Sequence, residues 1–447
     1  MKYIKNLLES HQNLSQKDDI SERYQRFSMI CNSLRAISIL LIVLFHIGTW
    51  FLVIRSYFPI YIAMIFDFGN IGLDFFIFLS GMLLVVNILQ RGIENHKWSD
   101  WYKKRVLRIY PAYWLMLIII MIFYLLFFGT VFNFHVILIN LSGFQTNLIY
   151  NPNFSSIHFI FWFLTIILSC YLLFPIIFYG IRKNFKITTI ITIALYLLYI
   201  FYSDIYSKPA LFLEKSLNFE LYNGTYMHFI FRFFEFFLGA LFGYWIGKDN
   251  MKNLDILFIN KIGLVFFIFV TSIFAFFIFS YLSGDYYRWI FPYITFLTIP
   301  FLFYVFNRFF KSNNYLEFFG KRSYEIFLCH SFIALFLFAI FLTKLLLPNN
   351  LILNLIILSL FIVLIFYFAY LLNKMVNIML KKQKWNPFFV LFALSLIIFT
   401  FISFFIFFPM ELYLSIPIYS SIVLILFYFY KKKGLGKNIL KEPKNKK

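Results

Sequence analysis

Long uninterrupted apolar runs constrain this chain more than any other feature of its sequence. Leu351–Tyr370 contains no charged side chain, and Leu115–Phe128 is almost wholly apolar. A helix needs about 20 such residues to cross the hydrocarbon core of a bilayer. Since 62% of the 447 residues are hydrophobic, the chain has enough apolar sequence for roughly a dozen crossings. We therefore expect an all-α polytopic membrane protein.

Apolar runs bounded by charged residues predict twelve membrane helices. The expected spans are residues 34–54, 71–90, 110–128, 157–179, 187–203, 227–246, 262–282, 289–306, 326–347, 351–373, 388–408 and 412–430. The expected segments are a cytoplasmic N-terminal segment (1–33), a ten-helix core (34–373), a connector with two further helices (374–430) and a basic cytoplasmic tail (431–447). The two longest outside connections, residues 129–156 and 204–226, are too short for a separate soluble domain.

The distribution of charge predicts the orientation in the membrane. The chain has 40 Lys and Arg against 19 Asp and Glu, a net charge of +21, which in a soluble protein would suggest a nucleic-acid partner. Here the basic clusters, such as Arg91–Arg108 and Lys431–Lys447, fall on one side if the N-terminus is cytoplasmic. The positive-inside rule then places both termini in the cytoplasm. No nucleic-acid partner is expected. No removable signal peptide is apparent in the polar N-terminus, so we expect the first helix to serve also as the targeting signal.

The three cysteines predict packing residues rather than a metal site. Cys31, Cys170 and Cys329 lie far apart, in or beside apolar runs. Their spacing does not match that of zinc ligands. We expect no metal and no permanently bound cofactor.

Ionisable residues inside the apolar spans are the candidate functional residues, because charge is costly in a bilayer and usually faces the interior of a helix bundle. Interhelical hydrogen bonding is the structural alternative for each of them. The candidates are Arg35, His46, Asp74, Arg232, Glu235, Glu325 and His330.

Arg35 and His46 are expected to act together. They are eleven residues apart, which is about 20° past three full helical turns, so they share a helix face about 16 Å apart along the axis. Arg35 would lie at the cytoplasmic interface and His46 near mid-membrane. This arrangement suits acyl-coenzyme A, with its phosphates at Arg35 and its thioester near His46. An imidazole there could deprotonate an acceptor hydroxyl or take the acyl group transiently.

Two further arginines, Arg105 and Arg108, are three residues apart where the third span begins. On a helix they face the same way, and two guanidinium groups can hold a phosphate bidentately. The alternative is that they only anchor the loop on the cytoplasmic side.

Five motifs in order resemble the integral-membrane acyltransferase-3 family. They are LRAISILLIVLFH ending at His46, GNIGLDFFIFLSG around Asp74, Arg105-x-x-Arg108 leading into Pro111, Arg232-x-x-Glu235 followed by Gly239, and GKRSYEIFLCH, which contains Tyr324 and ends at His330. The resemblance implies O-acylation, most often O-acetylation, of bacterial surface polysaccharides in the plasma membrane. It also implies acyl-CoA as co-substrate and a glycan or lipid-linked saccharide as acceptor.

The resemblance also suggests roles for the remaining residues. Asp74 could orient the imidazole of His46 if the two lie close together. The residues Arg232, Glu235, Tyr324 and His330 would line the acceptor site or serve as structural polar groups. The chain has Ile167 and Leu168 where many members carry acidic residues, which is closer to the exopolysaccharide-modifying branch.

Two other functions are compatible with a charged helix bundle. A transporter or flippase for a polysaccharide or lipid-linked saccharide would carry inverted repeats or broken helices, and none is evident in the sequence. An acyltransferase of another membrane family would also use an intramembrane histidine. It would not be expected to combine Arg35-x10-His46 with Arg105-x-x-Arg108.

Overall fold

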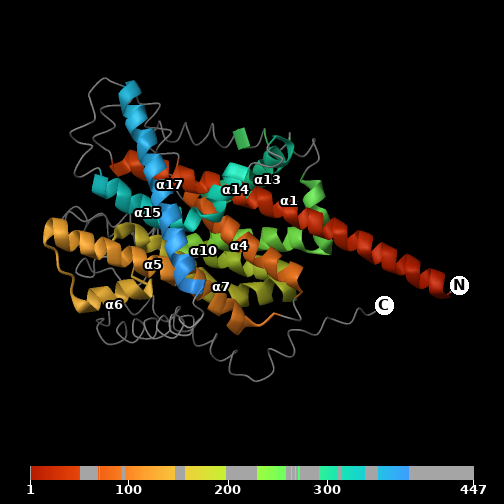
Figure 1. The fold of residues 1–447 in the computed structure, drawn as a ribbon. Helices are drawn as coiled ribbons and strands as arrows, with labels where there is room; N and C mark the ends of the chain where they lie inside the picture. Colours follow the sequence, from red (N-terminus) through yellow and green to blue (C-terminus); the bar gives the residue numbers. More distant parts are fainter. Residues whose placement is uncertain are drawn as a thin grey trace. The chain divides into compact units, whose positions relative to one another are not determined.

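The structure is a computed structural model, shown in Figure 1. It describes residues 2–50, 69, 71–92, 96–145, 157–197, 229–257, 263, 267, 270–271, 291–309, 314–337 and 351–381. Every regular element within these ranges is a helix, which confirms the all-helical prediction. The elements used below are α1 (Lys2–Trp50), α4 (Ile71–Arg91), α5 (Trp98–Phe128), α6 (Phe134–Ser142), α7 (Trp162–Lys183), α10 (Phe229–Gly247), α11 (Lys252–Ile256), α13 (Phe291–Phe309), α14 (Asn314–Lys321), α15 (Ser323–Leu337) and α17 (Leu351–Lys381).

The described residues include five helices that are long and apolar enough to cross a membrane. They are Ile20–His46 within α1, Ile71–Arg91, Trp98–Phe128, Trp162–Lys183 and Ser359–Leu380 within α17. The chain is therefore a multi-pass membrane protein. The expected spans 388–408 and 412–430 lie outside the described residues, so the total of twelve stays a prediction.

The chain forms two compact units. The first comprises Met1–Leu89 and Phe234–Ile378, and the second comprises Gln90–Phe233 and Met379–Lys447. Helix α10 begins in the second unit and continues into the first.

Helix α1 forms the axis of the first unit. It has 49 residues, which is about 74 Å of helix and more than twice the hydrocarbon thickness of a bilayer. The segment of α1 that is long and apolar enough to cross a membrane lies within Ile20–His46, and it overlaps the predicted span that begins at residue 34. Phe27 and Cys31 are apolar and buried, and the short polar side chains of Asn32 and Ser33 are buried with them.

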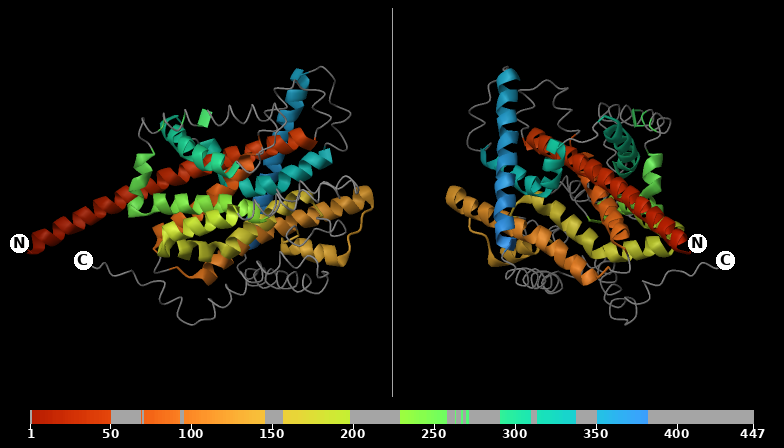
Figure 2. Two further views of the ribbon diagram at one scale, coloured as in Figure 1. Left: turned by 180° about the vertical axis from the view of Figure 1, so that it is seen from behind. Right: turned by 45° about the vertical axis from the view of Figure 1, so that its right-hand side comes forward.

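Other helices of the first unit pack along α1. The ring of Phe27 stacks on Phe303 of α13, with 5.7 Å between ring centroids. Gly320 of α14 lies against the backbone of Asn32, where a β-carbon would overlap the Asn32 carbonyl. Helices α13, α14 and α15 all contact α1, and Figure 2 shows α14 beside it in both views. Most of α1 between residues 27 and 43 is consequently buried.

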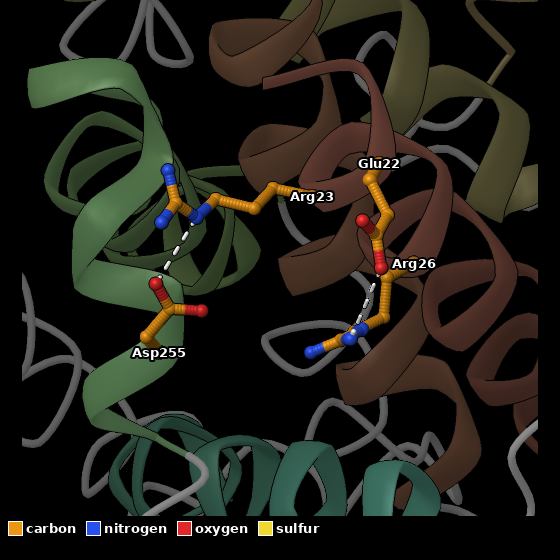
Figure 3. A network of polar contacts seen from close by, with 4 residues as sticks. All are labelled: Glu22, Arg23, Arg26 and Asp255. Carbon is orange, nitrogen blue, oxygen red and sulfur yellow. Dashed lines mark hydrogen bonds and ion pairs between the residues drawn. The ribbon is translucent and has the colours of Figure 1, made fainter. Parts of the chain in front are cut away.

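Polar contacts hold the N-terminal part of α1. Arg23 Nε donates to Asp255 Oδ2 of α11 at 3.0 Å, and Arg26 pairs with Glu22 one turn earlier at 3.6 Å (Figure 3). The hydroxyl of Tyr24 donates to Asn87 Oδ1 of α4 at 2.7 Å. These contacts fix α1 to α4 and α11.

Helices α4 and α10 meet through glycines. A β-carbon at Gly81 would overlap the carbonyl of Phe236, and β-carbons at Gly239 and Gly243 would overlap the carbonyls of Phe78 and Met82. Gly239 and Gly243 are one turn apart, the small-x-x-x-small spacing that lets membrane helices approach closely. The two backbones therefore touch directly, with no side chain between them.

In the second unit, α5 and α7 run antiparallel. Trp98 contacts Phe178, whereas Arg105, further along α5, contacts Tyr171, earlier on α7. The hydroxyl of Tyr102 donates to the Leu172 carbonyl at 3.0 Å. Pro175 lies on the same turn of α7, and because a proline has no N–H it cannot bond the Tyr171 carbonyl four residues before it.

The connection after α5 folds back along that helix. The terminal carbonyls of α6 accept hydrogen bonds from aromatic side chains of α5: Ser142 from Tyr110 at 2.8 Å, Leu141 from Trp114 at 2.8 Å, and Asn140 from Tyr113. Tyr110 lies 18 residues before the end of α5, which is about 27 Å along its axis.

Later parts of the chain complete the cap of α6. Thr165 of α7 donates to the Gly143 carbonyl at 2.8 Å, and the Ile157 N–H donates to Asn140 Oδ1 at 3.0 Å. Gly143 itself has a φ of +78°, a backbone conformation that favours glycine. The sequence predicts residues 129–156 as an outside connection. Its described part packs against α5 and α7, whose side chains satisfy its backbone carbonyls.

Candidate functional site

Two histidines far apart in the sequence meet at the end of α1. The Nε2 atom of His330, on α15, lies 3.3 Å from Nδ1 of His46, and the two ring centroids are 5.0 Å apart. His330 is 1% exposed, and His46 is partly buried. The structure thus brings together two candidates that the sequence had placed in different roles.

Backbone carbonyls determine which ring nitrogens carry protons. Nδ1 of His330 lies 2.6 Å from the Phe327 carbonyl, and Nδ1 of His46 lies 2.9 Å from the Ile42 carbonyl. A ring nitrogen that contacts a carbonyl oxygen must donate a proton, so both rings carry N–H at Nδ1 when neutral. Nε2 of His330 is then an acceptor that faces Nδ1–H of His46.

This tautomer suits His46 to accept a proton. With Nδ1–H directed at the Ile42 carbonyl and His330, the lone pair of His46 is on Nε2. After Nε2 takes up a proton, the same two acceptors stabilise the positive charge that has formed on the ring. The contact resembles the way a carboxylate orients the histidine of a catalytic triad, with an imidazole in place of the carboxylate.

Arg35 lies on the same helix as His46, three turns closer to the N-terminus. Because α1 is continuous through both residues, the prediction that they share a face about 16 Å apart is confirmed. Arg35 is partly buried.

Asp74 is fully buried in the first turn of α4. Gly72 lies against Ser38, Leu41 and Ile42, while Asn87 bonds Tyr24, so α1 and α4 are antiparallel.

This register places Asp74 level with Ser38, about two turns or roughly 12 Å along the axis from His46. His330 contacts the His46 ring. The orienting role of Asp74 toward His46 stays a prediction.

The remaining candidates of α10 and α15 are also placed. Arg232 and Glu235 lie one turn apart on α10, and both are fully buried. Glu325 is buried and accepts a hydrogen bond from Asn373 of α17 at 3.0 Å. Tyr324, beside it, is partly buried in the first turn of α15.

Arg105 and Arg108 belong to the second unit, where both lie on α5. The Arg105 guanidinium carbon lies 5.3 Å from the centre of the Trp101 ring and 5.7 Å from that of Tyr171. Arg108 is exposed. Ile167 and Leu168, the two apolar residues noted above in place of an acidic pair, are buried in α7.

Sequence reasoning missed two contacts of this site. It identified Glu325 but not Asn373. A single amide in a long apolar helix gives no sign in the sequence of which residue it contacts. It also separated His330 from His46. Both are histidines within predicted apolar spans, but no local pattern in the sequence pairs them.

The described residues show no group of three or more potential metal ligands. All three cysteines are buried and unlinked, as expected for packing residues.

A family model described as an acyltransferase domain matches residues 31–374, about three quarters of the chain. The chain belongs to the acyltransferase-3 family. No curated protein and no solved structure shows a detectable match to it. The matched segment of this membrane acyltransferase begins four residues before Arg35 and ends one residue after Asn373, so it includes the histidine pair and every other candidate residue above.

Proposed function

We propose that this membrane acyltransferase moves an acyl group, most simply acetyl, from cytoplasmic acyl-CoA to a hydroxyl of an extracytoplasmic or lipid-linked glycan, with His46 as the general base. The observation that carries the proposal is the contact between His46 and His330. It presents the basic nitrogen of His46 in the tautomer that proton abstraction requires, inside a segment that matches the acyltransferase family.

The proposed reaction is a direct transfer. Nε2 of His46 takes the proton of the acceptor hydroxyl while the oxygen attacks the thioester carbonyl. The tetrahedral intermediate then collapses, the carbon–sulfur bond breaks, and the departing thiolate takes the proton from the His46 imidazolium. The products are an O-acyl ester and free coenzyme A, and His46 returns to its neutral form.

The proposed surroundings follow from charge and family. The basic clusters favour a cytoplasmic location for both termini, and therefore for the donor. Absence of the acidic pair at Ile167 and Leu168 favours the exopolysaccharide-modifying branch, in a bacterial plasma membrane. The buried Arg232 and Glu235 and the partly buried Tyr324 are proposed to line the acceptor site or to support it.

Purified protein in neutral-lipid nanodiscs, supplied with radiolabelled acetyl-CoA and a glycan fraction from its own cells, tests the function. We expect label to appear in base-labile ester on the glycan. Label transfer that is equal in protein-free nanodiscs would contradict the proposal. Comparing succinyl-CoA and acetyl-CoA in the same assay identifies the acyl group.

Replacing His330 by phenylalanine should lower kcat by roughly ten- to a hundredfold, less than the roughly 10²- to 10⁴-fold effect of a general base itself. Phenylalanine keeps the ring volume but removes the acceptor for Nδ1–H of His46. His330→Gln retains an acceptor oxygen and should recover part of the rate. Steady-state kinetics with acetyl-CoA measure both, and a changed KM with unchanged kcat would point to a binding role instead.

Substituting Arg35, Arg105 or Arg108 by alanine should each weaken acyl-CoA binding by about ten- to a hundredfold. Each change removes a charge-assisted contact of about 1.5–3 kcal/mol. The corresponding lysine variants should recover only part of the affinity, because an ammonium group cannot hold two phosphate oxygens as a guanidinium does. Calorimetry in detergent measures the affinities. Unchanged binding in all three alanine variants would show that these arginines only orient the chain.

A further inference from the structure

A cluster of aromatic side chains lies at the start of α5 and along α7, within the second unit. We call it the aromatic cluster and define it as Trp98, Trp101, Tyr171, Phe174 and Phe178. The Trp101 ring stacks on Phe174 at 5.4 Å with an interplanar angle of 20°. Trp98 meets Trp101, Phe174 and Phe178 edge to face, with centroids 5.7, 6.1 and 6.2 Å apart.

The aromatic cluster is not an ordinary aromatic belt at a membrane interface. Belt residues face the lipid headgroups, whereas Trp101, Phe174 and Phe178 are buried. Trp98 and Tyr171 are partly exposed. The cluster therefore has a buried base and a partly open side, and the open side belongs to residues at the beginning of α5 and the middle of α7.

A guanidinium group lies against this cluster. The rings of Trp101 and Tyr171 hold the Arg105 side chain at 5.3 and 5.7 Å, which restricts it without using its N–H donors. The Nε atom of Arg105 is buried and makes no hydrogen bond in the structure. A buried donor without a partner is costly, and a phosphate oxygen is the acceptor that a guanidinium matches best.

A histidine also contacts Trp98. The His96 ring is 4.6 Å from the Trp98 ring, and its Nε2 atom is also buried without a hydrogen bond. Burial lowers the pKa of His96, and the cations Arg91 and Lys104 lower it further. The neutral imidazole therefore lies in a positive field, next to an aromatic ring, with one hydrogen-bonding atom unused.

We propose that the aromatic cluster, with Arg105 and His96, binds the adenosine 3′,5′-bisphosphate part of acyl-CoA, a role that rests on the proposed function. The purine stacks at Trp98, where His96 Nε2 can bond one of its ring nitrogens or its amino group. The phosphates bind Arg105, with Lys104 and Arg91 contributing charge. The ligand combines a flat base with several negative charges. These match the aromatic rings and the cationic side chains that lie together in this part of the structure.

Binding of adenosine 3′,5′-bisphosphate to the full-length protein in neutral-lipid nanodiscs tests this assignment by calorimetry. Trp98→Ala should lower the affinity about tenfold or more, because stacking of one base on an aromatic side chain contributes of that order. Trp98→Phe should recover most of the loss. The matched control is Trp245→Ala, which removes a partly buried tryptophan stacked on Phe242 of α10 and should leave the affinity unchanged.

A donor that lacks the nucleotide separates this subsite from the acyl transfer itself. Trp98→Ala should raise KM for acetyl-CoA about tenfold but leave kcat/KM for S-acetylpantetheine unchanged. Equal losses with both donors, or no loss with either, would overturn the nucleotide assignment while leaving acyl transfer intact. If neither donor reacts in the unmodified protein, the proposed function fails, and the bisphosphate titration still decides the subsite.

Anionic lipid headgroups also contain a phosphate group. A third experiment therefore distinguishes lipid binding from nucleotide binding. Repeating the titration in nanodiscs with phosphatidylglycerol should leave the affinity for the bisphosphate within about twofold. Displacement of the bisphosphate by this lipid, lost in Trp98→Ala, would assign the cluster to lipid and overturn the proposal.

Discussion

Replacing His46 by alanine or glutamine is expected to reduce acyl transfer by roughly 10²- to 10⁴-fold, the contribution of a positioned general base. Glutamine is the sharper variant, because its amide can still donate to the Ile42 carbonyl and contact His330 but cannot take up a proton. Both variants should retain binding of acyl-CoA, since the proposed phosphate contacts are made by arginines. Single-turnover transfer with saturating donor measures the chemical step directly.

The matched control for His46 lies on the same helix. The hydroxyl of Ser38 donates to the Leu34 carbonyl within α1, so Ser38→Ala disturbs the same buried stretch without touching the imidazole pair. It should keep nearly full activity. Wild-type transfer in a correctly folded His46→Gln protein would remove His46 from the mechanism.

Gly239→Ala is expected to destabilise the protein by about 2–3 kcal/mol, the upper part of the range for overpacked sites. The added methyl group would overlap the carbonyl of Phe78, and a backbone atom within a helix cannot turn aside as a side chain can. The loss should exceed the roughly 1 kcal/mol that alanine contributes over glycine in a helix. Thermal unfolding followed by fluorescence-detected size exclusion measures it.

Gly180→Ala provides the comparison. A β-carbon there would lie 3.1 Å from side-chain atoms of Thr188, which can rotate away, so the gain in helix propensity should balance the contact. We expect little change in Tm. Equal destabilisation at Gly180 and Gly239 would show that backbone contact between α4 and α10 is not what limits stability.

Local features of this chain are predictable from its sequence, because helical periodicity depends only on neighbouring residues. Arg35 and His46 could be placed on one face for that reason. Likewise, the glycines at positions 239 and 243 indicate a close helix contact, although they do not say which helix lies opposite. The α4 partner, with its Phe78 and Met82 carbonyls, follows only from the fold.

Contacts between distant elements are harder to predict. His46 and His330 are 284 residues apart in the sequence, and nothing local indicates that α15 lies beside the end of α1. Helices α1 and α4 are antiparallel neighbours, but their relative position along the axis depends on interhelical packing, which the sequence does not give.

The way α6 is capped also has a consequence for the order of assembly during synthesis. Its terminal carbonyls need Tyr110 and Trp114, which are made before it, and its continuation needs Ile157 and Thr165, which are made after it. The cap of α6 is therefore completed only after the first turn of α7 has been synthesised, because the Gly143 carbonyl takes its partner from Thr165. In the nascent chain, the end of this segment is fixed by the helix that follows it.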